Sequence, residues 1–418
     1  MSKVRGRRHR SRLRRVAALF YGLLSVFSGA VLINLVALTC LRAQSSNNPQ
    51  ASPEYSPPKV EVLKWQPPSR GWLYVLDPQE ESGQGDSQVL LVDPDAGAVR
   101  GVIRSGYRAD IALSPDGTRL YVLSGAPSWL TILDTQLGKV VRTVEIPDRA
   151  TSALLPWTQS LALTTDGRRL FLSKLGPGSA STARYSVGVF DTVSSALLPD
   201  DIPTLGCGYT RLMSISQQEL AVHCLESNDV RRFRVAQTGQ PTYVQTIPLP
   251  RGPQYDASGE RVPYFLPTAA AIALLPETPK LTVVMGDSSV YVMDTSSSAF
   301  SSSPVGGKAD RWVPFRAWPE SPDRKTLYLG RGLLSDRLDN RPWADQIAAI
   351  DTISGQERSA AAIMPHPFWT LTISTDGRFL YAPSPTHRLT TVIDASTLQA
   401  VRDITNVGLT PALALVSP

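Results

Sequence analysis

Short runs of apolar residues, separated by polar turns, recur along most of this chain. The segment IALSPDGTRLYVLS, Ile111 to Ser124, holds two such runs joined by a Pro-Asp-Gly turn. Proline fixes φ and glycine accepts a positive φ, so the pattern predicts a β-hairpin. Variants begin at Ser160, Ser321 and Leu371. A hairpin that recurs about every fifty residues indicates an array of repeated sheets.

All repeats but one also place an aspartate at the end of the third apolar run. We interpret these aspartates as turn residues whose carboxylates accept backbone N–H groups, rather than as metal ligands or catalytic acids. One interval is twice the usual length, and it holds an irregular repeat with ELAVHC and DVRRFRV as its second and third runs. The repeat count is therefore seven. The aspartates are Asp93, Asp134, Asp191, Asp294, Asp351 and Asp394.

The two ends of the repeat region complement each other. The first repeat opens on its second run at Leu73, whereas the chain ends with the single run TPALALV, Thr410 to Val416. A C-terminal inner strand would close a ring and cover an exposed sheet edge. A linear solenoid would instead end in polar capping repeats. The sequence thus predicts an all-β fold, a seven-bladed β-propeller over residues 71–418 that a C-terminal inner strand closes.

The first seventy residues follow a different pattern. Residues 1–15 carry eight basic side chains and no acid, and residues 16–41 contain no charge at all. A helix of that length can cross the hydrocarbon core of a membrane, and flanking cations place its N-terminal end in the cytoplasm. We therefore expect a basic cytoplasmic tail, one transmembrane helix and an extracytoplasmic propeller in a single-pass protein of the cell membrane.

Two alternatives to an uncleaved anchor stay open. A cleaved signal peptide also starts with cations, but its apolar run is usually shorter, and Leu41-Arg42-Ala43 lacks a small residue at its first position. Cys40 would be a lipidation site only in a lipoprotein signal, which the residues before it fit poorly. Residues 42–70 are rich in Pro and Ser and predict an extended linker, in which Lys59 to Trp65 is open to a further strand role.

The basic charge of the chain is concentrated in the tail. The formal net charge is +6, but the tail holds eight of the 42 basic residues and leaves 34 against 36 acidic ones. The propeller is therefore not a basic protein, and we expect no nucleic-acid partner.

Residues with catalytic potential are sparse. The chain has four histidines and no HExxH motif, Walker loop, GxSxG elbow or cluster of Cys and His ligands. This inventory argues against a zinc hydrolase or a Ser-His-Asp esterase, and it predicts no catalytic, metal or cofactor-binding residue. His366 is open to a position facing the central channel near Trp369, or to a solvated loop position.

Cys207 and Cys224 flank a segment long enough for a strand, a turn and a second strand. Outside the cytoplasm such a pair is expected to oxidise, so we predict a disulfide across adjacent strands, with two buried free thiols as the alternative.

Three segments break the repeat and are candidates for binding a partner protein on one rim: residues 173–185, 249–267 and 330–346. Aromatic and arginine side chains are typical of interfaces. The candidate rim residues are Arg251, Tyr255, Tyr264, Phe265, Arg337, Arg341 and Trp343, together with His366 and Trp369.

The repeats resemble the YVTN-type propeller family, in which a Ser-Pro-Asp-Gly turn precedes a Leu-Tyr-Val strand, as at 114–117 and 120–122. The middle of the chain is similar to the heavy chain of quinoprotein amine dehydrogenases. The similar features are Pro156-Trp157 ahead of Thr165-Asp166-Gly167, Cys207, His223-Cys224, Trp312, Trp318 and the insertion 330–346.

The narrower resemblance implies a periplasmic scaffold beside a small quinone-bearing subunit, with Cys207 and Cys224 as a disulfide pair and no catalytic residue in this chain. Three functions follow. The first is a membrane-anchored, non-catalytic binding or scaffold module. The second is a heavy-chain-like subunit of an amine-oxidising complex. The third is a lactonase-like hydrolase, an activity that also occurs on YVTN-like propellers.

Overall fold

A computed structural model of the chain describes residues 60–79, 87–106, 109–125, 128–147, 149–150, 161–175, 185–204, 206–207, 210–236, 238, 240–251, 269–274, 278–296, 299–300, 304–307, 311–314, 318–333 and 343–418. The expected membrane helix, residues 16–41, lies outside these ranges. Within them, no helix has the length and apolar character needed to cross a membrane.

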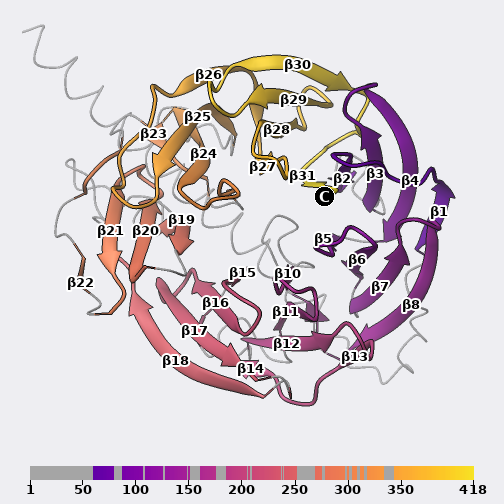
Figure 1. Cartoon of the computed structure of the whole chain (residues 1–418), viewed down its shortest axis with the longest axis horizontal. Helices are drawn as coiled ribbons and strands as arrows, with labels where there is room; N and C mark the ends of the chain where they lie inside the picture. The colour runs from indigo at the N-terminus through magenta and orange to yellow at the C-terminus, as the bar shows by residue number, and fades with distance from the viewer. Residues whose placement is uncertain are drawn as a thin grey trace, which may run out of the picture. The chain divides into compact units, whose positions relative to one another are not determined.

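The described strands form seven antiparallel sheets arranged as the blades of a ring (Figure 1), which confirms the predicted seven-bladed β-propeller. Blade 1 contains β31 (Leu413–Val416), β2 (Leu73–Asp77), β3 (Ser87–Asp93), β4 (Ala98–Gly106) and β1 (Glu61–Lys64). Blade 2 contains β5 (Asp110–Leu113), β6 (Arg119–Ser124), β7 (Ser128–Asp134) and β8 (Lys139–Ile146). Blade 3 contains β10 (Leu161–Leu163), β11 (Arg169–Leu175), β12 (Tyr185–Asp191) and β13 (Ala196–Leu197), with β9 (Arg149–Ala150) and β14 (Ile202–Pro203) beside them.

The remaining blades repeat this order from the inner to the outer strand. Blade 4, the irregular repeat, contains β15 (Thr210–Ser214), β16 (Glu219–Cys224), β17 (Asp229–Val235) and β18 (Pro241–Pro248). Blade 5 contains β19 (Ala269–Leu274), β20 (Lys280–Met285), β21 (Val290–Asp294) and β22 (Ala299–Phe300). Blade 6 contains β23 (Arg311–Trp312), β24 (Thr326–Leu333), β25 (Ala344–Asp351) and β26 (Ala362–Phe368). Blade 7 contains β27 (Thr372–Ile373), β28 (Phe379–Ser384), β29 (Leu389–Asp394) and β30 (Ala400–Thr405).

The hydrophobic core lies between neighbouring blades. Successive side chains of a strand point to opposite faces of its sheet. In β2, Tyr74 and Leu76 therefore pack against blade 2, whereas Leu73 and Val75 pack against blade 7. Because both faces of such a strand are covered, the second strand of each blade is an almost continuous apolar run. The outer strand β8, by contrast, is largely exposed.

The repeated aspartates hold turns, as the sequence predicted. The Oδ1 atom of Asp134 accepts hydrogen bonds from the backbone N–H groups of Gln136 at 3.0 Å and Leu137 at 2.9 Å. The Leu137 N–H makes the largest contribution to a lowered pKa of Asp134, and the guanidinium of Arg119 adds to it. Asp191, Asp351 and Asp394 accept backbone N–H groups in the same way.

The C-terminal strand closes the ring, which confirms the predicted complementarity of the two ends. β31 pairs with β2 in an antiparallel register that joins Leu413 to Leu76 and Val416 to Leu73. Close to the chain end, the backbone N–H of Ser417 donates to the carbonyl of Trp72 at 2.8 Å. The C-terminus thus occupies the inner edge that blade 1 would otherwise leave unpaired.

Part of the predicted linker is docked on the ring. β1 pairs with the outer strand β4, so blade 1 has five strands. The indole N–H of Trp65 donates to the carbonyl of Thr135 at 2.7 Å. A Cβ atom on Gly101 or Gly138 would lie 2.7 Å or 2.2 Å from the Trp65 ring, so the ring occupies space that only glycine leaves free. The strand role that the sequence left open for Lys59 to Trp65 is therefore confirmed for Glu61–Lys64, while Lys59 lies outside the described residues.

The antiparallel order gives the ring two different faces. The connections from first to second strand and from third to fourth strand lie on one face, which we call the short-turn face. The connections from second to third strand, and from each blade to the next, lie on the other, the long-connection face. The strand ends that flank the three segments predicted to break the repeat, 173–185, 249–267 and 330–346, lie on the long-connection face.

Candidate functional site

A cavity of about 690 Å³ occupies the centre of the ring. Every blade contributes to its wall: β31, β5, β10, β15, β19 and β27 supply residues from six blades, and the segment 318–324 ahead of β24 supplies them from blade 6. Figure 1 shows these inner strands around the ring centre. The volume falls within the range of about 300–1,000 Å³ that is typical of small-molecule sites.

The wall of this channel is largely apolar, because the inner strands carry residues such as Ile111, Leu161, Met213 and Ile272. The described lining residues include four ionisable side chains: Asp110, Arg211, Glu320 and Arg324. A mainly apolar wall with a few charged groups is the usual composition of a ligand pocket.

Arg211 lies on β15 and is almost fully buried, with 5% of its surface exposed. Its Nη2 donates to the carbonyl of Trp318 at 3.3 Å. Burial lowers the pKa of Arg211 to about 10, and the negative charge of Glu320 works in the opposite direction. The guanidinium therefore keeps its positive charge at neutral pH.

His223 stands directly across the ladder from Arg211, on β16. It is fully buried, and burial together with the nearby charge of Arg211 lowers its pKa to about 3. The imidazole is thus neutral at physiological pH. Of this pair of neighbouring residues, Arg211 is therefore positively charged at neutral pH and His223 is not.

Glu320 is half-buried in blade 6, two residues after Trp318, whose carbonyl accepts the hydrogen bond from Arg211. Burial raises its pKa, while Arg324 and then Arg211 act to lower it. Arg324 donates from Nη1 to the carbonyl of Ile215 at 3.4 Å. Among the described residues, no side chain or backbone group forms a hydrogen bond or ion pair with the Glu320 carboxylate. Glu320 therefore belongs to the cavity wall and interacts electrostatically with two guanidinium groups without forming an ion pair with either.

These groups can bind a molecule through charge-assisted hydrogen bonds, which are about twice as strong as neutral ones. In the described part of the chain no three His, Cys, Asp or Glu side chains are grouped as metal ligands. The described charged side chains of the channel can therefore bind a ligand through hydrogen bonds and charge.

The predicted rim residues that the structure describes, Arg251, Trp343, His366 and Trp369, are not among the lining residues of the channel. Arg251 is exposed and donates from Nη2 to the carbonyl of Ser227 at 3.1 Å. The Trp343 and Trp369 rings are in contact, with centroids 4.9 Å apart. Five further predicted residues lie outside the described part of the chain: Tyr255, Tyr264, Phe265, Arg337 and Arg341.

The alternative in which His366 faces the channel is wrong. His366 lies on β26, the outermost strand of blade 6, because the chain has already completed three strands of that blade when it reaches this residue. Its Nε2 lies 3.2 Å from Oδ2 of Asp403 in blade 7, and its ring lies 4.5 Å from the His387 ring, centroid to centroid. His366 is therefore part of a contact between the outer strands of two blades.

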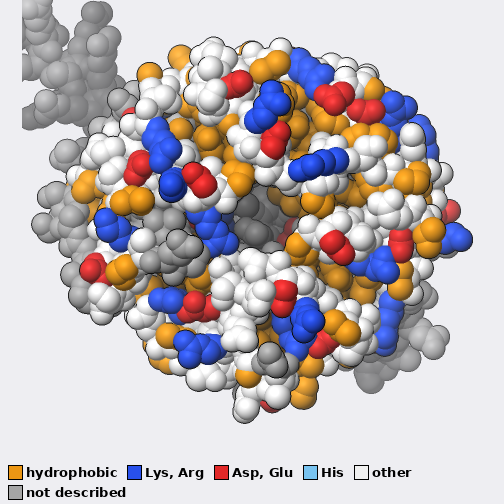
Figure 2. Space-filling model, in the orientation of Figure 1, with side chains coloured by type: hydrophobic (Ala, Val, Ile, Leu, Met, Phe, Trp, Pro, Cys, Tyr) orange, Lys and Arg blue, Asp and Glu red, His pale blue; other side chains and the backbone are white. Residues whose placement is uncertain are grey.

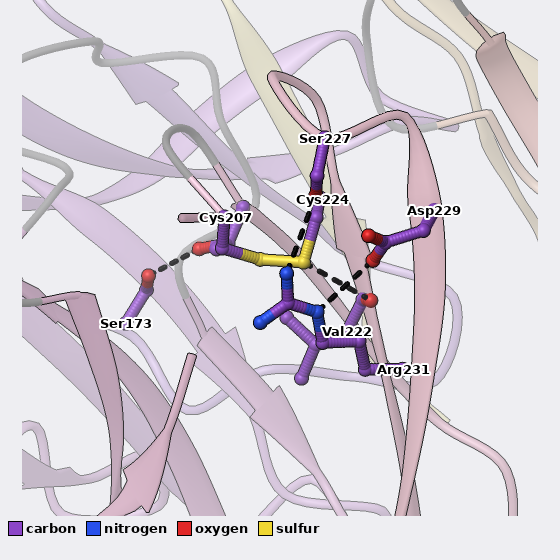
Figure 3. The surroundings of a disulfide bond; sticks show 8 residues. Ser173, Cys207, Val222, Cys224, Ser227, Asp229 and Arg231 are labelled. Carbon is purple, nitrogen blue, oxygen red and sulfur yellow. Dashed lines mark hydrogen bonds and ion pairs between the residues drawn. A yellow bond between two sulfur atoms is a disulfide. The ribbon is translucent and has the colours of Figure 1, made fainter. Parts of the chain in front are cut away.

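The disulfide between Cys207 and Cys224 is present, with 4.6 Å between the Cα atoms, and both residues are fully buried. Figure 3 shows Arg231 beside the bond, where its Nε donates to Asp229 Oδ1 at 3.1 Å. The expected geometry needs one correction. Cys224 ends β16, but Cys207 precedes β15, so the bond ties a loop to a strand end rather than two adjacent strands.

Sequence reasoning missed all four ionisable residues of the described channel wall, Asp110, Arg211, Glu320 and Arg324. Each lies in an ordinary repeat element, and the sequence signal that was available was weak: a basic residue inside the inner run TRLMS, and a glutamate in place of an apolar residue ahead of the turn SPDR.

No family model matches the chain, and no curated protein matches it. Many solved structures match. A functionally unknown protein from Desulfotomaculum acetoxidans has a TM-score of 0.57 and 14% identity over 83% of this chain and 98% of its own. The propeller domain of Myceliophteria thermophila Cps50 (Swd1) has a TM-score of 0.50 and 12% identity over 72% and 86%.

A third match is dihydro-heme d1 dehydrogenase NirN, with a TM-score of 0.48 and 16% identity over 84% of this chain. The chain spans 65% of the length of NirN. At these identities the comparisons show the propeller fold and nothing of its activity.

Proposed function

We propose that this chain is a membrane-tethered, extracytoplasmic and non-catalytic binding module, whose central channel holds a small molecule. The observation that carries the proposal is the cavity lined by all seven blades, with Arg211 and Glu320 in its wall. A rigid ring with a mainly apolar pocket and a few fixed charges is suited to binding.

The location of the module is argued from the sequence. The uncharged run 16–41 after a basic tail supports an anchor with its N-terminus in the cytoplasm. A disulfide is typical of a compartment outside the cytoplasm, so the bond between Cys207 and Cys224 supports the same topology for the propeller.

The surface supports a small molecule or a protein, rather than a nucleic acid, as the partner. Acidic and basic side chains are interspersed over the face of the ring shown in Figure 2, and no single sign dominates it. Nucleic-acid sites instead gather cations along one surface. A protein partner would dock on the long-connection face, where the candidate binding segments connect the strands.

The test uses the full chain, purified in lipid nanodiscs, and native mass spectrometry to detect a retained small molecule. Thr372 is half-buried in the channel wall on β27, so Thr372→Trp fills part of the cavity. Thr242→Trp is the matched control, because Thr242 is exposed on the outer strand β18. We expect the channel variant alone to lose the bound molecule. Equal retention by both variants, or substrate turnover by the isolated chain, contradicts the proposal.

A second candidate is a heavy-chain-like subunit of an amine-oxidising complex. The observation that favours it is the Cys207–Cys224 disulfide, the pairing that the resemblance to quinoprotein amine dehydrogenases implies. This function requires a small quinone-bearing companion. Staining native preparations for quinone decides between the two candidates, because the binding module alone contains none.

A further inference from the structure

The charges in the channel indicate what kind of molecule fits it. We propose that the channel binds a small zwitterion, an α-amino acid with an apolar side chain, through a carboxylate contact at Arg211 and an ammonium contact at Glu320. This inference rests on the proposed function, because it requires the channel to be a binding site.

Arg211 supplies the anion-binding end. Its guanidinium is fixed by the hydrogen bond to the Trp318 carbonyl and by its place in the β15–β16 ladder, and it forms part of the cavity wall. A planar guanidinium matches a carboxylate with two parallel hydrogen bonds, which an ammonium group cannot do.

Glu320 supplies the cation-binding end. Its carboxylate is in the cavity wall and half-buried, yet no described residue pairs with it. Buried carboxylates are normally paired or hydrogen-bonded, since an unpaired charge is costly. Arg211 and Arg324 act on it electrostatically and form no ion pair with it, so the carboxylate can accept hydrogen bonds from a molecule in the cavity.

The two groups together favour a zwitterion over a simple ion. Arg211 and Glu320 place one cationic and one anionic side chain in the wall of the same cavity. A ligand with both a carboxylate and an ammonium group can pair with each of them, whereas a simple ion can pair with only one.

The apolar residues of the channel wall favour a ligand with an apolar side chain. The inner strands present Ile111, Met213, Ile272 and Leu371 to the cavity. An apolar side chain gains free energy in proportion to the surface that it removes from water, so we expect amino acids with apolar side chains to bind more tightly than polar ones.

The experiment measures dissociation constants by calorimetry for the full chain in nanodiscs. The probes are L-alanine, L-valine, L-leucine, L-methionine and L-phenylalanine, each beside its amide and its deaminated acid. The amide lacks the carboxylate and the deaminated acid lacks the ammonium. Because each loses one charge contact in a buried site, we expect both to bind at least about 30-fold more weakly than the parent amino acid.

Two variants separate the two ends. Glu320→Gln should weaken binding of the amino acid and leave the deaminated acid nearly unchanged. Arg211→Lys keeps the charge but loses the planar fork, so it should weaken both. Glu219→Gln is the control, because Glu219 pairs with Arg232 in blade 4 and is not part of the channel wall. Thermal unfolding of each variant establishes that it is folded.

The results separate this inference from the proposed function. Binding of an amino acid that falls in Glu320→Gln but not in Glu219→Gln supports the inference. Equal affinity for the amino acid, its amide and its deaminated acid overturns it, as does a lack of binding by all five amino acids. If a different molecule is retained and lost in Thr372→Trp, the inference fails and the proposed function stands. If Thr372→Trp has no effect on any retained molecule, both fail.

Discussion

Removing the Cys207–Cys224 disulfide should cost the protein a predictable amount of stability. The bond joins residues that are 17 positions apart. The chain-entropy relation for a loop of this length gives about 3 kcal/mol of stabilisation at 25 °C, because the closed loop restricts the unfolded chain. The irregular blade 4 should be affected first, since the bond ties the loop ahead of β15 to the end of β16.

The assay is urea unfolding of the full chain in nanodiscs, followed by tryptophan fluorescence with and without a reducing agent. The perturbed protein is the double variant Cys207→Ala/Cys224→Ala. Reduction of the wild-type protein isolates the covalent term, because the side chains stay in place. The double variant adds the loss of two buried sulfur atoms, so it should be at least as unstable as the reduced wild type and should not respond to the reducing agent.

If mass spectrometry shows that the wild-type cysteines are reduced and the unfolding midpoint is nevertheless unchanged, then the disulfide does not stabilise the fold by restricting the unfolded chain.

Three further predictions concern the fold. Deleting residues 411–418 removes β31 and leaves the inner edge of β2 unpaired, so calorimetry should show loss of the cooperative transition; a normal transition would contradict ring closure. Trp65→Ala should lower the free energy of unfolding by about 2 kcal/mol, since the ring fills the space above two glycines, while Leu63→Ala at an exposed position of β1 should change it by less than about 0.5 kcal/mol. Burial alone would raise the pKa of Asp351, but hydrogen bonds from Ser354 N–H and Arg358 lower it to about 2 from 3.8. The stabilisation of the fold by the ionised Asp351 carboxylate is therefore complete above pH 3.8 and is lost as the pH falls towards 2. The difference in unfolding free energy between wild type and Asp351→Asn should vanish over that interval.

The architecture was predictable from the sequence because its signals are local. A Pro-Asp-Gly turn and an aspartate at a strand end specify their hydrogen bonds within a few residues, and these were confirmed at Asp116 for the turn and at Asp134 and Asp351 for the strand ends. The unmatched run at the C-terminus was enough to predict closure at β2.

The site was not predictable, because it depends on distances between elements far apart in the chain. Arg211 and Glu320 are separated by more than two blades in sequence, and only the closed ring brings them to one cavity. The period of the repeat does not show which residue of an inner run faces the channel. For the same reason His366 was open to the channel, whereas the strand order places it on the outer edge of blade 6.

The docked linker shows a further limit. Composition predicted an extended tether over residues 42–70, since Pro, Ser and Asn cannot bury much surface. Trp65 nevertheless packs on the ring, because Gly101 and Gly138, distant in sequence, leave room for its indole. Composition alone does not reveal that a tryptophan fits the space left by two glycines distant in sequence.

Purification of the full chain from its native membranes, followed by native mass spectrometry, protein analysis and a stain for bound quinone, tests directly whether this chain is a binding propeller whose channel holds a small molecule. We expect a colourless propeller that releases one small molecule when it unfolds. A stoichiometric quinone-bearing subunit beside an empty channel would contradict the proposed function.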